Sequence, residues 1–264
     1  MESIKLSLSG RLWERPTGYM NTLEDQIPVA RRLGYGGMEV RYPLLPAGDD
    51  IARVRAKFQE AGMEPTMCFC ASMPQNAAQW EDALRVIRTL SALGAPRMRI
   101  VISNPEQYAI ARELADKAAP HNVRLIVHYH INTYCDSAAR AVEIMEGIGH
   151  PNVRLLFDPA HVALAGDADI AGITERLLPW TDYINIQDFR RTDADAGDIK
   201  GYNGFWLRNL PGEPGGLDFA AFVGTLKKIG YKGWLNVMSA TAPMDAKDPV
   251  ATAQAYAEHF AKLL

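Results

Sequence analysis

Histidine and aspartate side chains cluster where two apolar runs of the sequence end. His128 and His130 close the run VRLIVHYH, Asp158 closes NVRLLFD, and His161 follows three residues later. An imidazole can accept or donate a proton near neutral pH, and a nearby carboxylate orients the ring and stabilises its charged form. Imidazole and carboxylate groups are also ligands for transition metals. These four residues therefore predict proton transfer, a small metal site, or both.

Two later apolar runs end in a similar way. Asn185 lies in YINIQD, and Met238 closes GWLNVM. Successive side chains of a strand point to opposite faces, so His128 and His130 share one face of their run and alternate apolar residues occupy the other. The same alternation places Asn185 and Met238 opposite the apolar faces of their runs. The sequence predicts that these polar faces point to a common interior.

The elements that must bring these residues together alternate along the chain. Between the strands, apolar residues recur every three or four positions, as in amphipathic helices. Eight such units require parallel strands with right-handed crossovers, and they close into a single (β/α)8 barrel spanning residues 1–264. An open doubly wound sheet is the alternative, but no GxGxxG turn follows the first strand. The strands are expected at residues 4–9, 37–41, 65–70, 97–102, 123–130, 153–158, 182–187 and 233–238.

A barrel of this kind gathers its functional residues at one end. The carboxyl ends of the strands and the loops that follow them form a mouth, where barrel enzymes bind substrate. Glu39 and Arg41 are expected there, either as an internal ion pair or as substrate contacts. Trp13 and Trp206 lie in long segments expected over the mouth, where their rings could stack on a sugar or a flat aromatic group, or could instead anchor a lid by packing.

Composition argues against several classes of protein. Lys and Arg total 28 against 31 Asp and Glu, and no basic block occurs, so the chain lacks the electrostatic signature of a nucleic-acid-binding protein. No run approaches the roughly 20 apolar residues of a membrane helix. The N-terminus lacks the pattern of a secretory signal. We therefore expect a cytoplasmic protein that acts on a small molecule, with no nucleic-acid or membrane partner.

The cysteines support the same expectation. Cys68 and Cys70 share one face of a predicted strand, while Cys135 lies elsewhere. This spacing matches neither a disulfide framework nor a zinc site. We expect three reduced thiols, buried as small apolar side chains.

Longer stretches of the sequence resemble a known barrel superfamily. The runs NVRLLFDPAHVALAGD, DYINIQDFRR and PGEPGGLDFAAFVGTLKKIGYKGWLNV, with GYGGMEVR nearer the N-terminus, resemble the xylose isomerase-like TIM barrels, the sugar phosphate isomerases and epimerases. The similarity extends over essentially the whole chain and implies that barrel fold. It also implies a homodimer or homotetramer. The motifs indicate the superfamily without specifying one substrate.

The resemblance implies where a metal site would lie. Members usually bind a divalent cation through a glutamate on strand five, an aspartate on strand six, a histidine on strand seven and a glutamate on strand eight. Here these positions hold His128, Asp158, Asn185 and Met238, so only the aspartate is kept. As substrate contacts, the resemblance implies the second-strand residue Glu39, His161 and Arg208; Asn185 and Met238 are expected in the pocket wall.

These substitutions change the expected metal chemistry. Loss of two carboxylates weakens the attraction for Mg²⁺ or Mn²⁺, and the Met238 thioether does not suit these hard cations. His128 and Asp158, with Asn185 or a neighbouring histidine, could form a nitrogen-richer site for a zinc- or iron-like ion. Alternatively, no metal binds, and the histidines act as acid and base.

Three functions remain open at this stage. The first is an isomerase or epimerase that moves a proton at a carbon next to a carbonyl or hydroxyl group of a small polyhydroxylated substrate. His128 or His130 would be its base or acid, Asp158 would orient them, and His161 and Arg208 would hold substrate oxygens. The second is a lyase that eliminates from a glycoside or an aromatic conjugate. The third is a barrel that binds a ligand or an active relative without catalysis.

Overall fold

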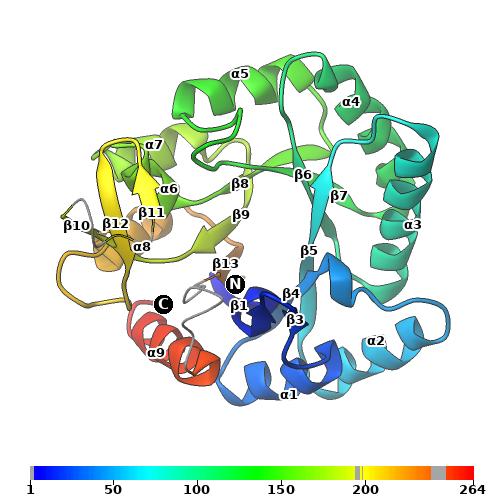
Figure 1. Ribbon diagram of the computed structural model, residues 1–264, viewed down its shortest axis with the longest axis horizontal. Coiled ribbons are helices and arrows are strands. Elements are labelled where there is room, and N and C mark those ends of the chain that lie inside the picture. Colours follow the sequence, from blue (N-terminus) through cyan, green and yellow to red (C-terminus); the bar gives the residue numbers. More distant parts are fainter. Residues whose placement is uncertain (1–2, 194–196, 198, 239–247) are drawn as a thin grey trace.

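Eight parallel strands close into a barrel surrounded by helices (Figure 1). The computed structural model describes residues 3–193, 197, 199–238 and 248–264, and only the backbone of residues 69–72. The predicted (β/α)8 barrel is confirmed, with strand ends within about two residues of those expected. Around the ring, the strands are β1 (Lys5–Ser9), β4 (Gly37–Arg41), β5 (Glu64–Ser72), β6 (Arg97–Val101), β7 (Arg124–His128), β8 (Val153–Phe157), β9 (Thr181–Ile186) and β13 (Trp234–Val237).

Helices cover the outside of the barrel. Local sequence sets their ends: the Thr22 hydroxyl accepts a hydrogen bond from the Asp25 backbone N–H at the start of α1, and Gly94, at a left-handed φ of 90°, ends α3. The α-helices are α1 (Leu23–Arg32), α2 (Asp50–Glu60), α3 (Ala77–Leu93), α4 (Gln107–Ala118), α5 (Ala138–Ile148), α6 (Pro159–Leu164), α7 (Ile170–Leu177), α8 (Phe219–Lys228) and α9 (Pro249–Ala261), and the 3-10 helices are η1 (Gly10–Trp13), η2 (Tyr42–Leu44) and η3 (Ala119–His121).

The two faces of the strands have different neighbours. Outward residues such as Leu125 and Val127 belong to the main core, which they share with the helices. Inward residues form a separate buried cluster inside the barrel, consisting of Met67, Ile126, Leu156, Tyr183 and Trp234. Ile126 precedes His128 by two residues, so both point to the same side of β7. The predicted polar faces therefore do point into the barrel, above this apolar cluster.

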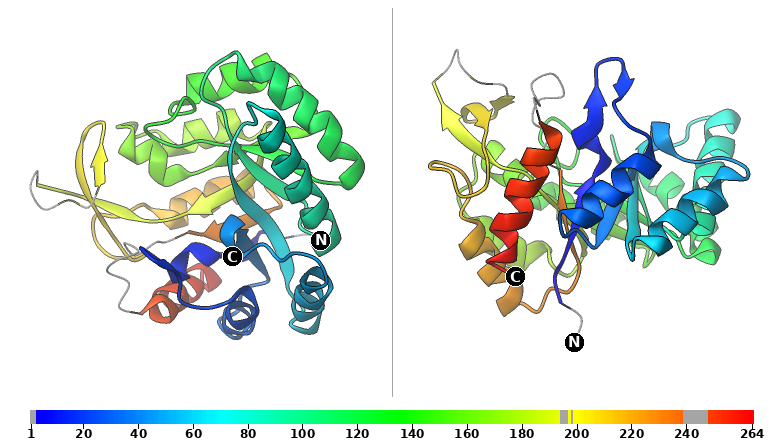
Figure 2. Two further views of the ribbon diagram at one scale, coloured as in Figure 1. Left: turned by 45° about the vertical axis from the view of Figure 1, so that its right-hand side comes forward. Right: turned by 90° about the horizontal axis from the view of Figure 1, so that it is seen from below.

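Two small sheets lie outside the barrel, and the sequence patterns did not predict them. β2 (Glu14–Arg15) pairs with β3 (Gly18–Tyr19) after β1, and β12 (Gly204–Arg208) pairs with both β10 (Phe189–Thr192) and β11 (Ile199–Gly201) after β9. Figure 2 shows that both sheets project from the same end of the barrel, away from the N-terminus. They flank the mouth formed by the carboxyl ends of the strands.

The second of these sheets is joined to the loop after β7. The Tyr202 hydroxyl accepts a hydrogen bond from the Asn132 backbone N–H at 2.9 Å and donates one to the Asp136 carboxylate at 2.7 Å. This contact fixes the loop that carries His130 against the sheet.

Among the described residues, no helix is both long and apolar enough to cross a membrane.

Candidate functional site

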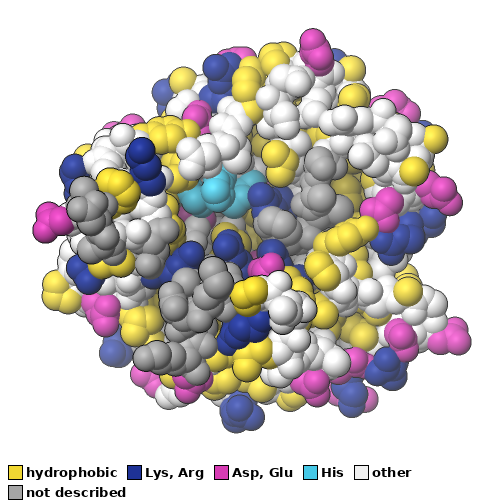
Figure 3. Space-filling model, viewed as in Figure 1, with side chains coloured by type: hydrophobic (Ala, Val, Ile, Leu, Met, Phe, Trp, Pro, Cys, Tyr) yellow, Lys and Arg dark blue, Asp and Glu magenta, His cyan; other side chains and the backbone are white. Residues whose placement is uncertain are grey.

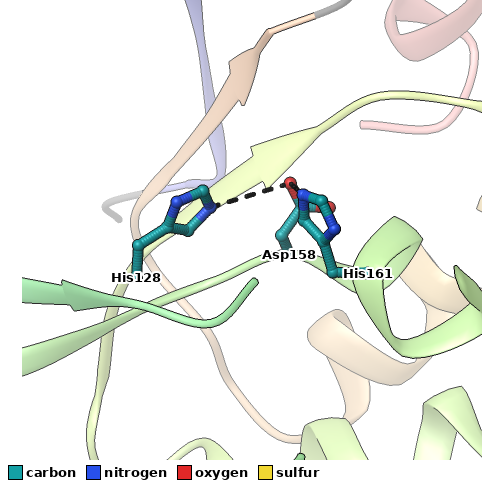
Figure 4. A group of neighbouring side chains, drawn as sticks. All are labelled: His128, Asp158 and His161. Atoms are coloured by element: carbon teal, nitrogen blue, oxygen red, sulfur yellow. Dashed lines mark ion pairs between the residues drawn. The ribbon is translucent and has the colours of Figure 1, made fainter. Parts of the chain in front are cut away.

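Three of the predicted site residues converge at the carboxyl ends of β7 and β8. His128 is the last residue of β7, Asp158 follows β8, and His161 lies in α6. Asp158 Oδ2 lies 3.6 Å from His161 Nε2 and 4.0 Å from His128 Nε2. Figure 4 shows the two rings on either side of the carboxylate. All three side chains are buried.

Asp158 uses its two carboxylate oxygens differently. Oδ1 accepts a hydrogen bond from the Ala160 backbone N–H at 3.0 Å and so caps α6, whose first residue is Pro159. Oδ2 accepts a hydrogen bond from Gln187 Nε2 at 2.7 Å and faces the two imidazoles. The same side chain therefore starts a helix and contributes charge to the site.

His130 lies closer to the solvent than the other two histidines. It is half-buried, and its ring centroid lies 3.7 Å from that of His161 and 5.1 Å from that of His128. Its Nδ1 forms a hydrogen bond with the backbone carbonyl oxygen of Ile131. Because a carbonyl oxygen can only accept, Nδ1 carries the proton when the ring is neutral, and Nε2 is left as a proton acceptor.

Burial shifts the protonation of all four groups. Desolvation raises the pKa of the Asp158 carboxyl to about 7, although the hydrogen bond from Gln187 opposes the rise. Desolvation, with the nearby Arg99 guanidinium, lowers the pKa of His128 well below its usual value; desolvation and the neighbouring His130 do the same for His161. The pKa of His130 falls to about 4, mainly through desolvation. At neutral pH the three imidazoles are therefore uncharged acceptors or ligands.

His128, Asp158 and His161 form a donor set that could hold a metal ion. One ligand atom from each lies within 4.8 Å of the others. Metal binding requires neutral imidazoles, and the lowered pKa values of both histidines provide them. The set thus fits a divalent cation, with His161 as the neighbouring histidine that completes it.

Asn185 does not join this set in the way expected. Its Nδ2 lies 3.3 Å from His128 Nε2 and 3.5 Å from Met238 Sδ, while its Oδ1 accepts a hydrogen bond from Asn236 Nδ2. A metal binds an amide through oxygen, and the oxygen of Asn185 points away from the site. In this orientation Asn185 directs no oxygen toward the site, and its role as a metal ligand stays a prediction. Met238 is buried beside Asn185, and its place in the pocket wall stays a prediction.

Glu39 and Arg41 form a buried ion pair. Arg41 donates to Glu39 Oε1 at 2.9 Å, and it also contacts the Tyr19 hydroxyl at 3.2 Å and the Glu14 carboxylate at 3.5 Å. Of the two sequence interpretations, the internal ion pair is the one that the structure shows. Neither residue is among those that line the cavity beside the histidines.

That cavity has a volume of about 130 Å³ and opens at the mouth of the barrel. Of the described residues that line it, two are arginines, two are histidines and none is an aspartate or glutamate. Figure 3 shows histidine side chains within the hollow of this face, with basic side chains close by. A substrate here would meet groups that favour electron-rich oxygens. Its polar lining residues are Arg11, His130, Asn132, His161, Gln187 and Arg208.

The two predicted stacking tryptophans are not in this cavity. Trp13, the last residue of η1, is 1% exposed and belongs to the main core. Trp206, in β12, is 8% exposed and packs against Ile131, Ala160 and Leu164. Of the two expectations, packing is the one that the structure shows, because both segments fold back into compact elements that bury a large aromatic ring. Trp206 supports the cavity wall from behind.

Several cavity and site residues were not predicted from the sequence. Gln187 and Asn236 lie on the same strand faces as Asn185 and Met238, so the period-two pattern contained the signal that would have identified them. Arg11 lies in the one-turn helix η1 after β1, and Asn132 lies in the loop after β7; both segments are too short for a periodicity to indicate which side chain turns inward.

Comparison with known proteins gives a consistent picture. A family model described as xylose isomerase-like TIM barrel matches residues 27–262. Inosose dehydratase of Mesomycoplasma hyopneumoniae (strain 7448) is 29% identical over 133 residues, which cover 48% of this chain and 43% of that protein. The alignment therefore spans less than half of that relative.

Solved structures with low sequence identity share the fold. The probable 3-DHS dehydratase AsbF of Bacillus anthracis, involved in petrobactin synthesis, has a TM-score of 0.78 at 14% identity, covering 98% of this chain and 99% of that one. D-allulose 3-epimerase from Methylomonas sp. has a TM-score of 0.72 at 16% identity, covering 100% of this chain and 99% of that one. At these identities the likeness is one of architecture.

Proposed function

The chain belongs to the xylose isomerase-like TIM barrel family, and we propose that it is an enzyme that removes a proton from a carbon next to a carbonyl group of a small polyhydroxylated substrate. We further propose that the reaction ends in loss of water. The observation that supports this most is the convergence of His130, His161 and Asp158 on one side of an arginine-lined cavity.

Each group has a role that follows from its position. His130 lines the cavity and presents Nε2 as an acceptor, so it would take the proton from carbon. Arg11 and Arg208 would bind the carbonyl and hydroxyl oxygens and stabilise the negative charge that develops on the enolate. The C–H electron pair then expels the neighbouring hydroxyl group, which leaves as water after receiving the proton from the His130 imidazolium; Asp158 contacts His161 and contributes charge behind the cavity wall.

The one-sided arrangement favours dehydration over epimerisation. Inverting a carbon centre requires a base on one face of the substrate and an acid on the other. His130, His161 and Asp158 come from neighbouring elements, the loop after β7 and the start of α6. Among the described residues that line the cavity, none is an aspartate or glutamate that could act from the opposite face, and Glu39 is already paired with Arg41. Elimination, or an isomerisation on one face, needs catalytic groups on one face of the substrate only. The sequence relative named inosose dehydratase supports this choice.

A metal ion would assist the same chemistry. We propose that His128, Asp158 and His161 hold it, and two imidazoles with one carboxylate suit a zinc- or iron-like ion better than Mg²⁺. When bound, such an ion polarises a carbonyl oxygen and makes the adjacent C–H more acidic.

Proton exchange in heavy water tests the proposal. The protein would be incubated in D₂O with an inosose, D-allulose and a panel of other ketoses and keto acids. Proton NMR would report deuterium at the carbon next to the carbonyl, and mass spectrometry would report a product lighter by one water. His130→Gln and Asp158→Asn should each lower the exchange rate by about a hundredfold or more, the usual contribution of a positioned base or acid.

A matched substitution controls for folding. His121, in η3, lies outside the site, so His121→Gln should leave exchange unchanged. The proposal fails if no substrate exchanges deuterium. It also fails if His130→Gln and Asp158→Asn, folded by circular dichroism, exchange at the wild-type rate. Exchange without loss of water would replace the dehydratase with an isomerase.

A further inference from the structure

A chain of buried hydrogen bonds crosses the barrel from Glu39 on β4 to His128 on β7. It starts at the Glu39–Arg41 ion pair, where Arg41 donates to Oε1 of the carboxylate. The second oxygen, Oε2, accepts from Asn236 Nδ2 at 2.8 Å. A carboxylate in an ion pair with a guanidinium offers only acceptors. Asn236 must therefore direct its NH₂ group, and not its carbonyl oxygen, toward Glu39.

This orientation is transmitted to Asn185. The Asn236 Nδ2 atom also donates to Asn185 Oδ1 at 3.0 Å. The carbonyl oxygen of Asn236 is left buried with no partner among the described residues, which is unfavourable. The flipped amide would instead place that oxygen against the Glu39 carboxylate, which is worse. With its own oxygen engaged, Asn185 can only direct its NH₂ group toward His128 Nε2, at 3.3 Å.

We propose that Asn236 is a positioning residue that, through Asn185, holds Nε2 of His128 unprotonated as a hydrogen-bond acceptor. A proton on Nε2 would confront the Asn185 NH₂ group, donor against donor. The neutral ring therefore carries its proton on Nδ1. The Glu39 carboxylate fixes the polarity of every amide in this relay, so the assignment does not depend on telling amide nitrogen from oxygen.

The relay has a consequence for chemistry, which rests on the proposed function. His128 Nε2 and Asp158 Oδ2 lie 4.0 Å apart, and both are acceptors. The gap between them suits a cation, which satisfies two acceptors at once. His128 and Asp158 would then hold the cation, and His130, which lines the cavity, is left to move the proton to and from substrate.

Nitrogen NMR of the imidazoles in the intact, chelator-treated protein tests the proposal. The nitrogen shifts of a neutral imidazole differ between its two tautomers, and His128→Gln would assign the signal by its loss. We expect wild-type His128 in the Nδ1–H form. Asn185→Asp exchanges one NH₂ group for oxygen and reverses the polarity, so His128 should gain a proton on Nε2. Asn236→Ala frees Asn185 to rotate, and His128 should show averaged shifts of both tautomers.

Two comparisons make the outcome decisive. Asn104→Asp, the same substitution at an exposed position after β6, should leave the His128 signal unchanged. An Nε2–H tautomer in wild type overturns the proposal, even if the variants do not fold. Unchanged His128 shifts in folded Asn185→Asp also overturn it. No substrate is involved, so the tautomer result stands whether or not deuterium exchange is found.

Discussion

Arg11 illustrates how a single side chain sets the character of the cavity. It lies in η1 and lines the cavity that contains His130. Its Nε atom has no hydrogen-bond partner among the described residues, and the nearest carboxylate oxygen, on Glu14, lies 3.9 Å away. Its charge also contributes to the lowered pKa values of His128 and His161. Arg11 is thus placed to bind a substrate oxygen.

We predict that Arg11→Gln weakens substrate binding more than turnover. Losing one charge-assisted hydrogen bond should raise KM about tenfold or more, with a smaller change in kcat. Steady-state kinetics on whichever substrate exchanges deuterium would measure both. Arg176→Gln removes the same charge from an exposed position on α7 and should change neither constant. Equal KM values for wild type and Arg11→Gln would exclude this role.

The residue scale is also where sequence reasoning reached its limit. Asn185 was correctly placed on the inward face of its strand, but the direction of its amide depends on Asn236 and, through it, on Glu39, which lies 197 residues from Asn236 in sequence. Trp13 was expected over the mouth, yet the chain turns into η1 and buries it. Local patterns do not contain contacts of such long range.

At the scale of elements, the turn after β12 shows how closely the mouth is packed. The buried Asp188 carboxylate accepts hydrogen bonds from the Leu217 backbone N–H at 2.8 Å and from Asn209 Nδ2 at 3.0 Å. Gly216 lies directly against this contact: an added Cβ would lie 2.2 Å from Asp188 Oδ2 and 2.4 Å from Asn209 Nδ2. A glycine is required at position 216 because the side chains of Asp188 and Asn209 approach it so closely. This turn positions α8.

We predict opposite effects for two Gly→Ala substitutions. Gly216→Ala should lower the free energy of unfolding by about 2 kcal/mol or more, because the methyl group must displace a buried hydrogen-bonded carboxylate. Gly224→Ala, inside α8 with open space around its Cβ position, should raise it by up to about 1 kcal/mol. Urea denaturation would measure both. A neutral Gly216→Ala would show that the turn moves freely.

Element patterns were the most predictable part of the fold. Strand alternation predicted that His128, Asp158 and Met238 point inward, because each strand has one face for the helices and one for the interior. Because the strands are parallel, these three strand-end residues also lie at the same end of the closed barrel. The sheet formed by β10, β11 and β12 was not predicted. Its strands pair across an insertion after β9, and the barrel repeat gives no signal for such a sheet.

At the scale of the whole molecule, an ion held at the proposed site would couple metal binding to folding. His128 and Asp158 come from neighbouring strand ends and His161 from α6, so the three ligands meet only in the folded barrel. An ion that binds only the folded state, at a free concentration of about 100 times its Kd, adds about 2.7 kcal/mol to the free energy of unfolding. For a chain of this size, that corresponds to a rise in Tm of about 5 °C or more.

We therefore predict that Zn²⁺ raises the Tm of chelator-treated protein and that renewed chelation reverses the rise. Differential scanning calorimetry with increasing Zn²⁺ would measure the shift, and equimolar Mg²⁺ should produce much less, because two of the three ligands are nitrogen. His161→Gln removes one ligand and should abolish most of the effect, whereas His121→Gln, outside the site, should retain it. A Zn²⁺ shift of the same size in both variants would assign the ion to another place on the barrel, and no shift in wild type would leave the three residues to act by acid–base chemistry alone.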